Sequence, residues 1–126
     1  MSNVCFVILT LVIFTGFALG ESTEEMLSSC KAVSEAKVSD TTAAFPKNFE
    51  SGECWGALSA LQYVSRLVDL KGQPLLPIGC VPEKTTRTQL VAIFVAYARD
   101  NPQLWHEDFV SIAMTAFKAA FQCRPK

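Results

Sequence analysis

The chain has 126 residues, half of them hydrophobic, and its twelve acidic and eleven basic residues nearly cancel to a formal net charge of −1. The charges are mixed along the sequence without a basic block, which argues against nucleic acid or an anionic membrane as the partner. A chain of this length supports one domain with one core.

The first twenty residues have the features of a secretory signal. Every residue from 4 to 19 is apolar or small except two threonines, a run suited to a signal core and short for a membrane span of about 20 residues. Ala18-Leu19-Gly20 has the small-x-small form that signal peptidase accepts. We expect cleavage between Gly20 and Glu21, which leaves residues 21–126 as the mature, exported domain. An uncleaved anchor is the alternative, because residues 1–3 include no lysine or arginine.

A capping box opens the mature chain. Ser22 and Glu25 stand three residues apart, so each side chain can satisfy an exposed backbone donor of the other residue. This pattern predicts a helix that begins here and continues to about Lys37. Its apolar residues recur at three- and four-residue steps and share one face: Met26, Leu27, Cys30, Val33 and Ala36.

The next segment, residues 38–50, has no helical period and is expected to be a loop with at most one short turn. Ser51 is the expected N-cap of a second helix, which continues to Leu70 and is stopped by Gly72 and Pro74. The apolar stripe of this helix is Cys54, Leu58, Leu61, Val64, Leu67 and Val68.

Residues 71–82 contain three prolines and two glycines, which predicts a stiff, irregular connector that ends near Cys80. A second capping box, formed by Thr86 and Gln89, opens a third helix. The expected inward face of that helix is Leu90, Val91, Phe94, Val95 and Ala98.

The last helix is expected to begin at Pro102, because Asn101 is a favoured N-cap and proline a favoured first helical residue. Its apolar stripe is wider than one neighbouring helix needs, and we expect some of the surplus in a homodimer interface. The stripe consists of Leu104, Trp105, Phe109, Ile112, Ala113, Ala116, Phe117, Ala120 and Phe121. The predicted fold class is all-α: a small, disulfide-stapled bundle of four or slightly more helices.

Four cysteines remain after the signal, Cys30, Cys54, Cys80 and Cys123, and an even number in a short exported chain indicates structural disulfides. Sequence alone leaves three pairings open. The expected positions favour Cys30 with Cys54, which joins the first two helices, and Cys80 with Cys123, which joins the connector to the C-terminal end. Each closure would contribute about 3–4 kcal/mol. A zinc site is the weaker interpretation, because no C-x-x-C pair occurs.

No set of residues predicts catalysis, and neither a metal nor a cofactor is expected. His106, flanked by Glu107 and Asp108, is the only histidine, and such a position is usually solvated surface. Oxidised cysteines would provide no thiolate for a Cys–His pair. Among the large aromatic residues, Trp55 is the best candidate for a partner contact because it lies off the Leu58–Leu61 stripe.

Several short motifs, taken in order, resemble the Rap/Tai immunity proteins of type VI secretion. They are Cys54-Trp55-Gly56, Gly79-Cys80-Val81-Pro82, Thr86-x-x-Gln89-Leu90-Val91, Tyr97, Asn101-Pro102 and Ala120-Phe121-x-Cys123. Two positions depart from the family pattern: Gln122 stands where the family often has proline, and Ala60 where a small glycine is common. These differences suggest a divergent member.

The resemblance implies a helical, periplasmic and often dimeric protein that is not an enzyme and that binds a peptidoglycan amidase effector. We expect inhibition by occlusion of the amidase cleft, with residues 74–79 as the stiffest exposed candidate for the contact. The expected contact residues are Pro74, Leu75, Leu76, Pro77, Ile78, Gly79 and Trp55. The alternative is a general periplasmic stress or chaperone-like protein without a dedicated toxin, since a helical scaffold does not fix a partner.

Overall fold

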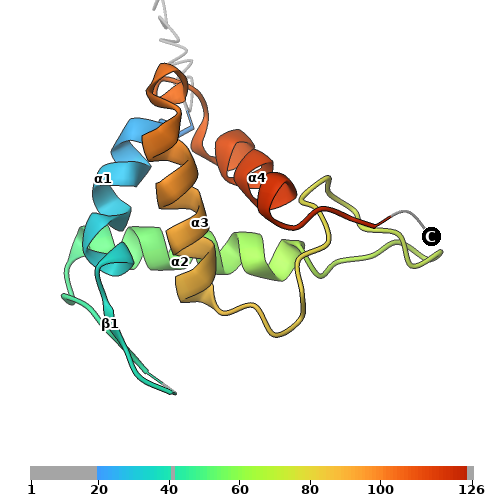
Figure 1. Cartoon of the computed structure of the whole chain (residues 1–126), viewed down its shortest axis with the longest axis horizontal. Helices are drawn as coiled ribbons and strands as arrows, with labels where there is room; N and C mark the ends of the chain where they lie inside the picture. Colours follow the sequence, from blue (N-terminus) through green and yellow to red (C-terminus); the bar gives the residue numbers. More distant parts are fainter. Residues whose placement is uncertain (1–19, 41, 125–126) are drawn as a thin grey trace, which may run out of the picture.

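The computed structural model describes residues 20–40 and 42–124. In chain order the elements are α1 (Thr23–Ser34), β1 (Lys37–Val38), β2 (Ala43–Ala44), α2 (Phe49–Val64), α3 (Arg87–Asp100), a 3₁₀ helix η1 (Pro102–Leu104) and α4 (Phe109–Ala120). The predicted bundle of four main helices is confirmed, with a small hairpin added (Figure 1). The predicted signal falls on residues 1–20, of which 1–19 lie outside the described part of the chain.

Helix α1 begins as its capping box predicts. The Ser22 hydroxyl accepts a hydrogen bond from the Glu25 amide at 3.3 Å, and the Ser22 amide donates to the Glu25 carboxylate at 2.9 Å. The helix ends at Ser34 rather than near Lys37. The chain then forms the antiparallel hairpin β1–β2, in which Lys37 pairs with Ala44. The expectation of an irregular loop was therefore wrong at this point, where two short strands satisfy each other's backbone groups.

Helix α2 begins and ends earlier than the sequence predicts. Its N-cap is Asn48, whose side chain accepts a hydrogen bond from the Ser51 amide at 3.0 Å. Ser51, the expected cap, is instead a buried residue of the first turn. At the other end the helix stops at Val64, and Leu67 is 50% exposed. The predicted stripe is buried only as far as the neighbouring helices reach, so nothing holds the last residues in a helix.

Helix α3 agrees with its prediction. Thr86 caps it through a bond from the Gln89 amide, and the Gln89 side chain completes the capping box. All five residues expected on the inward face are buried. In Figure 1 this helix stands between α1 and α4 and crosses in front of α2.

The predicted fourth helix is divided in two. Pro102 opens only the 3₁₀ turn η1, and α4 begins at Phe109 with Asp108 as its N-cap. The carbonyls of Trp105 and Glu107 accept hydrogen bonds from the Glu24 and Thr23 amides, both at 2.9 Å. The Phe109 amide, which a continuous helix from Pro102 would bond to the Trp105 carbonyl, donates instead to the Glu21 carbonyl at 3.0 Å.

One core joins the four helices. It contains Phe94 of α3, packed edge-on against Phe109 of α4 with ring centroids 5.1 Å apart. The inward residues of α4 are buried within a single chain: Phe109, Ile112, Ala113, Ala116 and Phe117. The apolar surplus that suggested a homodimer is thus largely used inside the monomer.

The four cysteines form two disulfides, Cys30–Cys54 and Cys80–Cys123. These are the pairs that the expected helix positions favoured. The first joins α1 to α2 and both of its residues are fully buried. The second joins the connector to the segment after α4, and both of its residues are exposed.

Within the described residues, no helix combines the length and the hydropathy needed to cross a membrane.

Candidate partner-binding surface

The segment between α2 and α3, residues 65–86, is the longest irregular segment between two helices in the described chain. We call it the connector. In Figure 1 it extends away from the bundle beside the C-terminal end. Four of its leucines are exposed, to 50% at Leu67, 108% at Leu70, 54% at Leu75 and 37% at Leu76. Exposed leucines on one loop are unusual for a surface that contacts only water, and they make this segment the first candidate for a contact with another protein.

The tip of the connector is a closed turn around Asp69. One carboxylate oxygen of Asp69 accepts hydrogen bonds from the amides of Lys71 and Gln73, both at 2.8 Å. The Gly72 amide donates to the Asp69 carbonyl at 3.0 Å, and Gly72 has a φ of 75°. That backbone region favours glycine. An isolated bridge between Val68 and Pro74 closes the turn at its base.

The far end of the connector is fixed to the bundle. Ile78 is only 1% exposed and belongs to the core. Gly79 follows with a φ of 93°, and a Cβ atom there would lie 2.7 Å from the carbonyl oxygen of Phe121. The Cys80 amide donates to that same carbonyl at 2.9 Å. The disulfide to Cys123 fastens the same point covalently. Glycine is required because the two backbones approach too closely for a side chain.

Between the connector and the end of α4 lies a largely apolar groove of ≈ 620 Å³. We call it the connector groove. Its lining residues are Pro74, Leu75, Leu76, Pro77, Gly79, Lys118, Gln122 and Cys123. Five of the seven contact residues expected from the sequence therefore surround one space. Ile78 is not among them, because its buried side chain anchors the loop and is not available to a partner.

Trp55 lies elsewhere, beside the hairpin. Its ring packs on Phe45 with centroids 5.0 Å apart, and the Arg87 guanidinium stands 4.6 Å from its centroid. The surrounding hollow is lined by β1, β2 and the start of α3, with no residue of the connector groove. The structure thus does not bring Trp55 together with residues 74–79. The packing on Phe45 and the cation–π contact hold the half-buried Trp55 ring in place, apart from the connector groove.

Sequence reasoning missed the other wall of the groove. Lys118 and Gln122 line it from the end of α4, and the exposed Leu67 and Leu70 were assigned to a helix. The expected Cys80–Cys123 pairing could have indicated these residues, because a disulfide between Cys80 and Cys123 must place the connector beside residues near Cys123.

The chemistry of the described residues offers no catalytic centre. The His106 side chain is 77% exposed, and its Nε2 lies 3.1 Å from the Glu107 carboxylate. The four cysteines of the domain are disulfide-bonded. Residues 20–40 and 42–124 contain no cluster of histidine, cysteine or carboxylate side chains that could hold a metal ion.

Two carboxyl groups near the start of α1 have shifted pKa values for structural reasons. Desolvation raises the pKa of Glu21, and repulsion from Glu53 and Glu25 adds to the rise. Hydrogen bonds from the Ser22 backbone and side chain lower the pKa of Glu25. The rise at Glu21 thus reflects desolvation first and neighbouring carboxylates second, whereas the fall at Glu25 reflects the helix cap.

Comparison with known families decides the class of the protein. The model of the Rap1a immunity proteins matches residues 22–123. The chain belongs to the Rap1a immunity protein family. The resemblance inferred from the motifs is confirmed, and membership of an immunity family makes the chain an inhibitor rather than an enzyme. No curated protein and no solved structure matches the chain.

The motifs that resemble the family have structural roles in this Rap1a protein. Cys54 forms a disulfide with Cys30, and Cys80 forms one with Cys123. Thr86 and Gln89 cap α3, and Gly79 permits the close contact with the Phe121 backbone. The Asn101 side chain donates to the Tyr97 carbonyl at 2.9 Å where α3 ends.

The two positions that are expected to depart from the family pattern lie at different places. Gln122 lines the connector groove, whereas Ala60 is exposed on α2. The Rap1a motifs thus stabilise the fold, whereas Gln122 lies on the candidate binding surface.

Proposed function

We propose that this Rap1a protein is a periplasmic immunity protein that inhibits a peptidoglycan amidase effector of type VI secretion. The observation that carries the proposal is the family match over residues 22–123. The proposal includes export to the periplasm, with cleavage of the signal between Gly20 and Glu21. Two disulfides suit an oxidising compartment such as the periplasm.

The proposed mechanism is occlusion by the connector. Its tip is held by four hydrogen bonds that involve Asp69, and its base by Ile78 and the Cys80–Cys123 disulfide. A segment held at both ends loses little conformational entropy on docking. Its exposed leucines supply apolar area that becomes buried when they enter a cleft of the amidase. The contact residues are Pro74, Leu75, Leu76, Pro77 and Gly79, with Trp55 as a separate, secondary contact.

The test is protection of cells that receive an amidase in the periplasm, together with the inhibition constant of the purified pair. Leu75→Asp places a charge on the exposed connector and is expected to weaken inhibition at least about tenfold, as loss of an interface anchor does. Val110→Asp is the matched control, because Val110 is 41% exposed on α4 and does not line the connector groove. Equal effects of the two variants would contradict occlusion by the connector.

The chaperone-like alternative predicts a different result. Purified protein would then suppress aggregation of unrelated clients at low pH, and no amidase would be inhibited. No feature of the described structure favours this alternative over the family function.

A homodimer stays a prediction. Its original argument weakens because the inward face of α4 is buried within one chain. Sedimentation velocity of the mature protein at micromolar concentration measures the oligomeric state directly.

A further inference from the structure

Basic residues gather around the connector although the chain as a whole is nearly neutral. Residues 65–84 and 118–124 contain five basic residues and two acidic ones. The basic ones are Arg66, Lys71, Lys84, Lys118 and Arg124, and the acidic ones are Asp69 and Glu83. The other described residues contain ten acidic and five basic side chains. The protein is therefore polarised, with a basic connector end and an acidic remainder.

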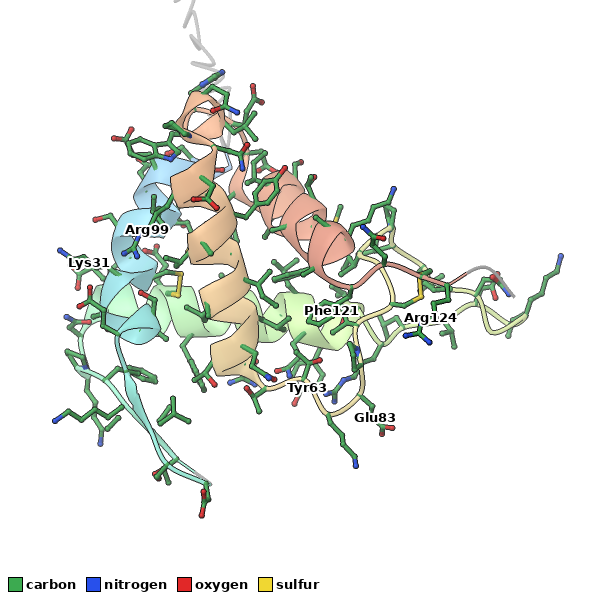
Figure 2. The ribbon with its side chains drawn as sticks, in the orientation of Figure 1. Lys31, Tyr63, Glu83, Arg99, Phe121 and Arg124 are labelled. Atoms are coloured by element: carbon green, nitrogen blue, oxygen red, sulfur yellow. A yellow bond between two sulfur atoms is a disulfide. The ribbon has the colours of Figure 1, made fainter. Side chains whose placement is uncertain are left out.

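The connector cations are not neutralised by neighbours. Within residues 20–40 and 42–124, the one ion pair is His106 with Glu107. Lys71, Lys118 and Arg124 are exposed, and Figure 2 shows Arg124 beside the connector. The Asp69 carboxylate accepts two amide hydrogen bonds within its own turn, and within the described residues it forms no ion pair with a lysine or arginine. The positive charge of this end is thus available to a partner.

These cations flank an apolar centre. Lys71 follows the fully exposed Leu70 at the connector tip, and Lys118 lines the groove opposite Leu75 and Leu76. An apolar centre with a charged rim is the usual anatomy of a protein–protein interface. The centre includes a concave groove beside a projecting turn. A surface of this uneven shape fits the surface of another folded protein better than a flat lipid bilayer.

We propose that the connector end recognises an acidic rim around an apolar cleft on the amidase, and that Lys71, Lys118 and Arg124 set the association rate. This inference rests on the proposed function and adds the chemistry of the partner's surface. The acidic remainder of the molecule is repelled by such a rim, so the approaching protein is oriented with the connector forward. Complementary charge raises association rates and disfavours partners with basic clefts.

The experiment measures association rates with purified peptidoglycan amidase effectors of type VI secretion. The exported, disulfide-bonded protein is compared with Lys71→Glu, Lys118→Glu and Arg124→Glu at low and at physiological salt. Lys47→Glu is the control, because Lys47 is exposed just before α2 and lies outside the connector. Circular dichroism establishes that all four variants are folded.

We expect each connector variant to slow association about threefold to tenfold at low salt, with smaller effects at higher salt. The control should change the rate less than about twofold. If an amidase is inhibited but its association rate changes neither with salt nor with these substitutions, the charge inference is overturned and the proposed function stands. Absence of inhibition of every amidase overturns both.

A bilayer partner gives a distinct result. Co-sedimentation with phosphatidylcholine vesicles containing about a third phosphatidylglycerol tests it without any protein partner. Binding that Lys71→Glu abolishes, together with no effect of the same substitution on amidase association, would assign the connector cations to a lipid surface and overturn the inference.

Discussion

At the scale of single residues, Gly79 is the position where the structure leaves least freedom. Its φ of 93° is unfavourable for other residues, and a Cβ atom would approach the Phe121 carbonyl oxygen to 2.7 Å and the Lys118 Cα to 3.0 Å. Both neighbours are backbone atoms, so neither can move like a flexible side chain.

We therefore expect Gly79→Ala to lower the free energy of unfolding by roughly 1–3 kcal/mol. Gly56→Ala is the control, since a Cβ there meets nothing within 4 Å. Alanine in the interior of α2 should stabilise by about 0.5–1 kcal/mol. Urea denaturation of both variants measures the difference, and equal stabilities would show that the connector relaxes around a side chain.

Two serines of similar burial make a second comparison. The Ser51 hydroxyl is buried without a hydrogen-bond partner, whereas the Ser29 hydroxyl donates to the Glu53 carboxylate at 2.8 Å. Ser51→Ala removes an unsatisfied polar group, and we expect it to be neutral or to stabilise by up to about 1 kcal/mol. Ser29→Ala should cost about 1 kcal/mol. Thermal unfolding distinguishes them, and a large loss at Ser51 would reveal a partner such as a buried water.

The Glu25 carboxyl is expected to make the stability of the folded protein depend on pH. Its pKa in the folded protein is lowered by the hydrogen bonds from Ser22. A lowered pKa contributes stability above the unfolded value of 4.5, and this contribution is lost as the pH falls through the folded pKa. Glu25→Gln should therefore be less stable than the native protein at pH 7, with a difference that shrinks below pH 4.5.

Glu24→Gln serves as the control for this titration, because it removes a charge from the same first turn without touching the capping box. A difference at Glu25 that persists unchanged at acid pH would mean that shape, not charge, causes it. Chemical denaturation at a series of pH values gives both curves.

At the scale of elements, the two disulfides hold different parts of the molecule. Cys30–Cys54 is buried between α1 and α2, and Cys80–Cys123 is exposed at the connector. A reductant reaches an exposed disulfide before a buried one.

We expect mild reduction to open Cys80–Cys123 first and to leave the helices folded. Its loss should cost about 3–4 kcal/mol of stability by the loop-entropy estimate and should also weaken amidase inhibition. Alkylation followed by peptide mass spectrometry identifies the reduced pair, while circular dichroism follows the helices. Simultaneous opening of both pairs would show that the connector and the bundle unfold together.

The element boundaries show how far local signals determine this fold. Capping boxes at Ser22 and Thr86 give the start of α1 and α3, because the interactions involve residues only three apart. The starts of α2 and α4 were mispredicted. At α4, tertiary hydrogen bonds to the start of α1 decide the boundary, and no local pattern reports a partner more than 80 residues away.

At the scale of the whole molecule, the arrangement follows from which faces are apolar and from the two disulfides. The sequence predicts the all-α class, the buried face of α3 and an exposed connector, since these depend on periodicity and on proline and glycine. It does not predict the groove, because the groove needs the connector and the end of α4 in the same place. It does not predict the polarity of charge either, which appears only when segments 65–84 and 118–124 are brought together by folding.

The Cys80–Cys123 disulfide also affects how the protein can be labelled. Cys123 lines the connector groove, so a purification tag fused shortly after this cysteine begins close to the proposed binding surface. Under the predicted cleavage between Gly20 and Glu21, a tag ahead of Met1 would be removed with the signal. The exposed Asp40, at the turn of the β1–β2 hairpin, is the better insertion point for an epitope or fluorophore, because it lies away from both ends.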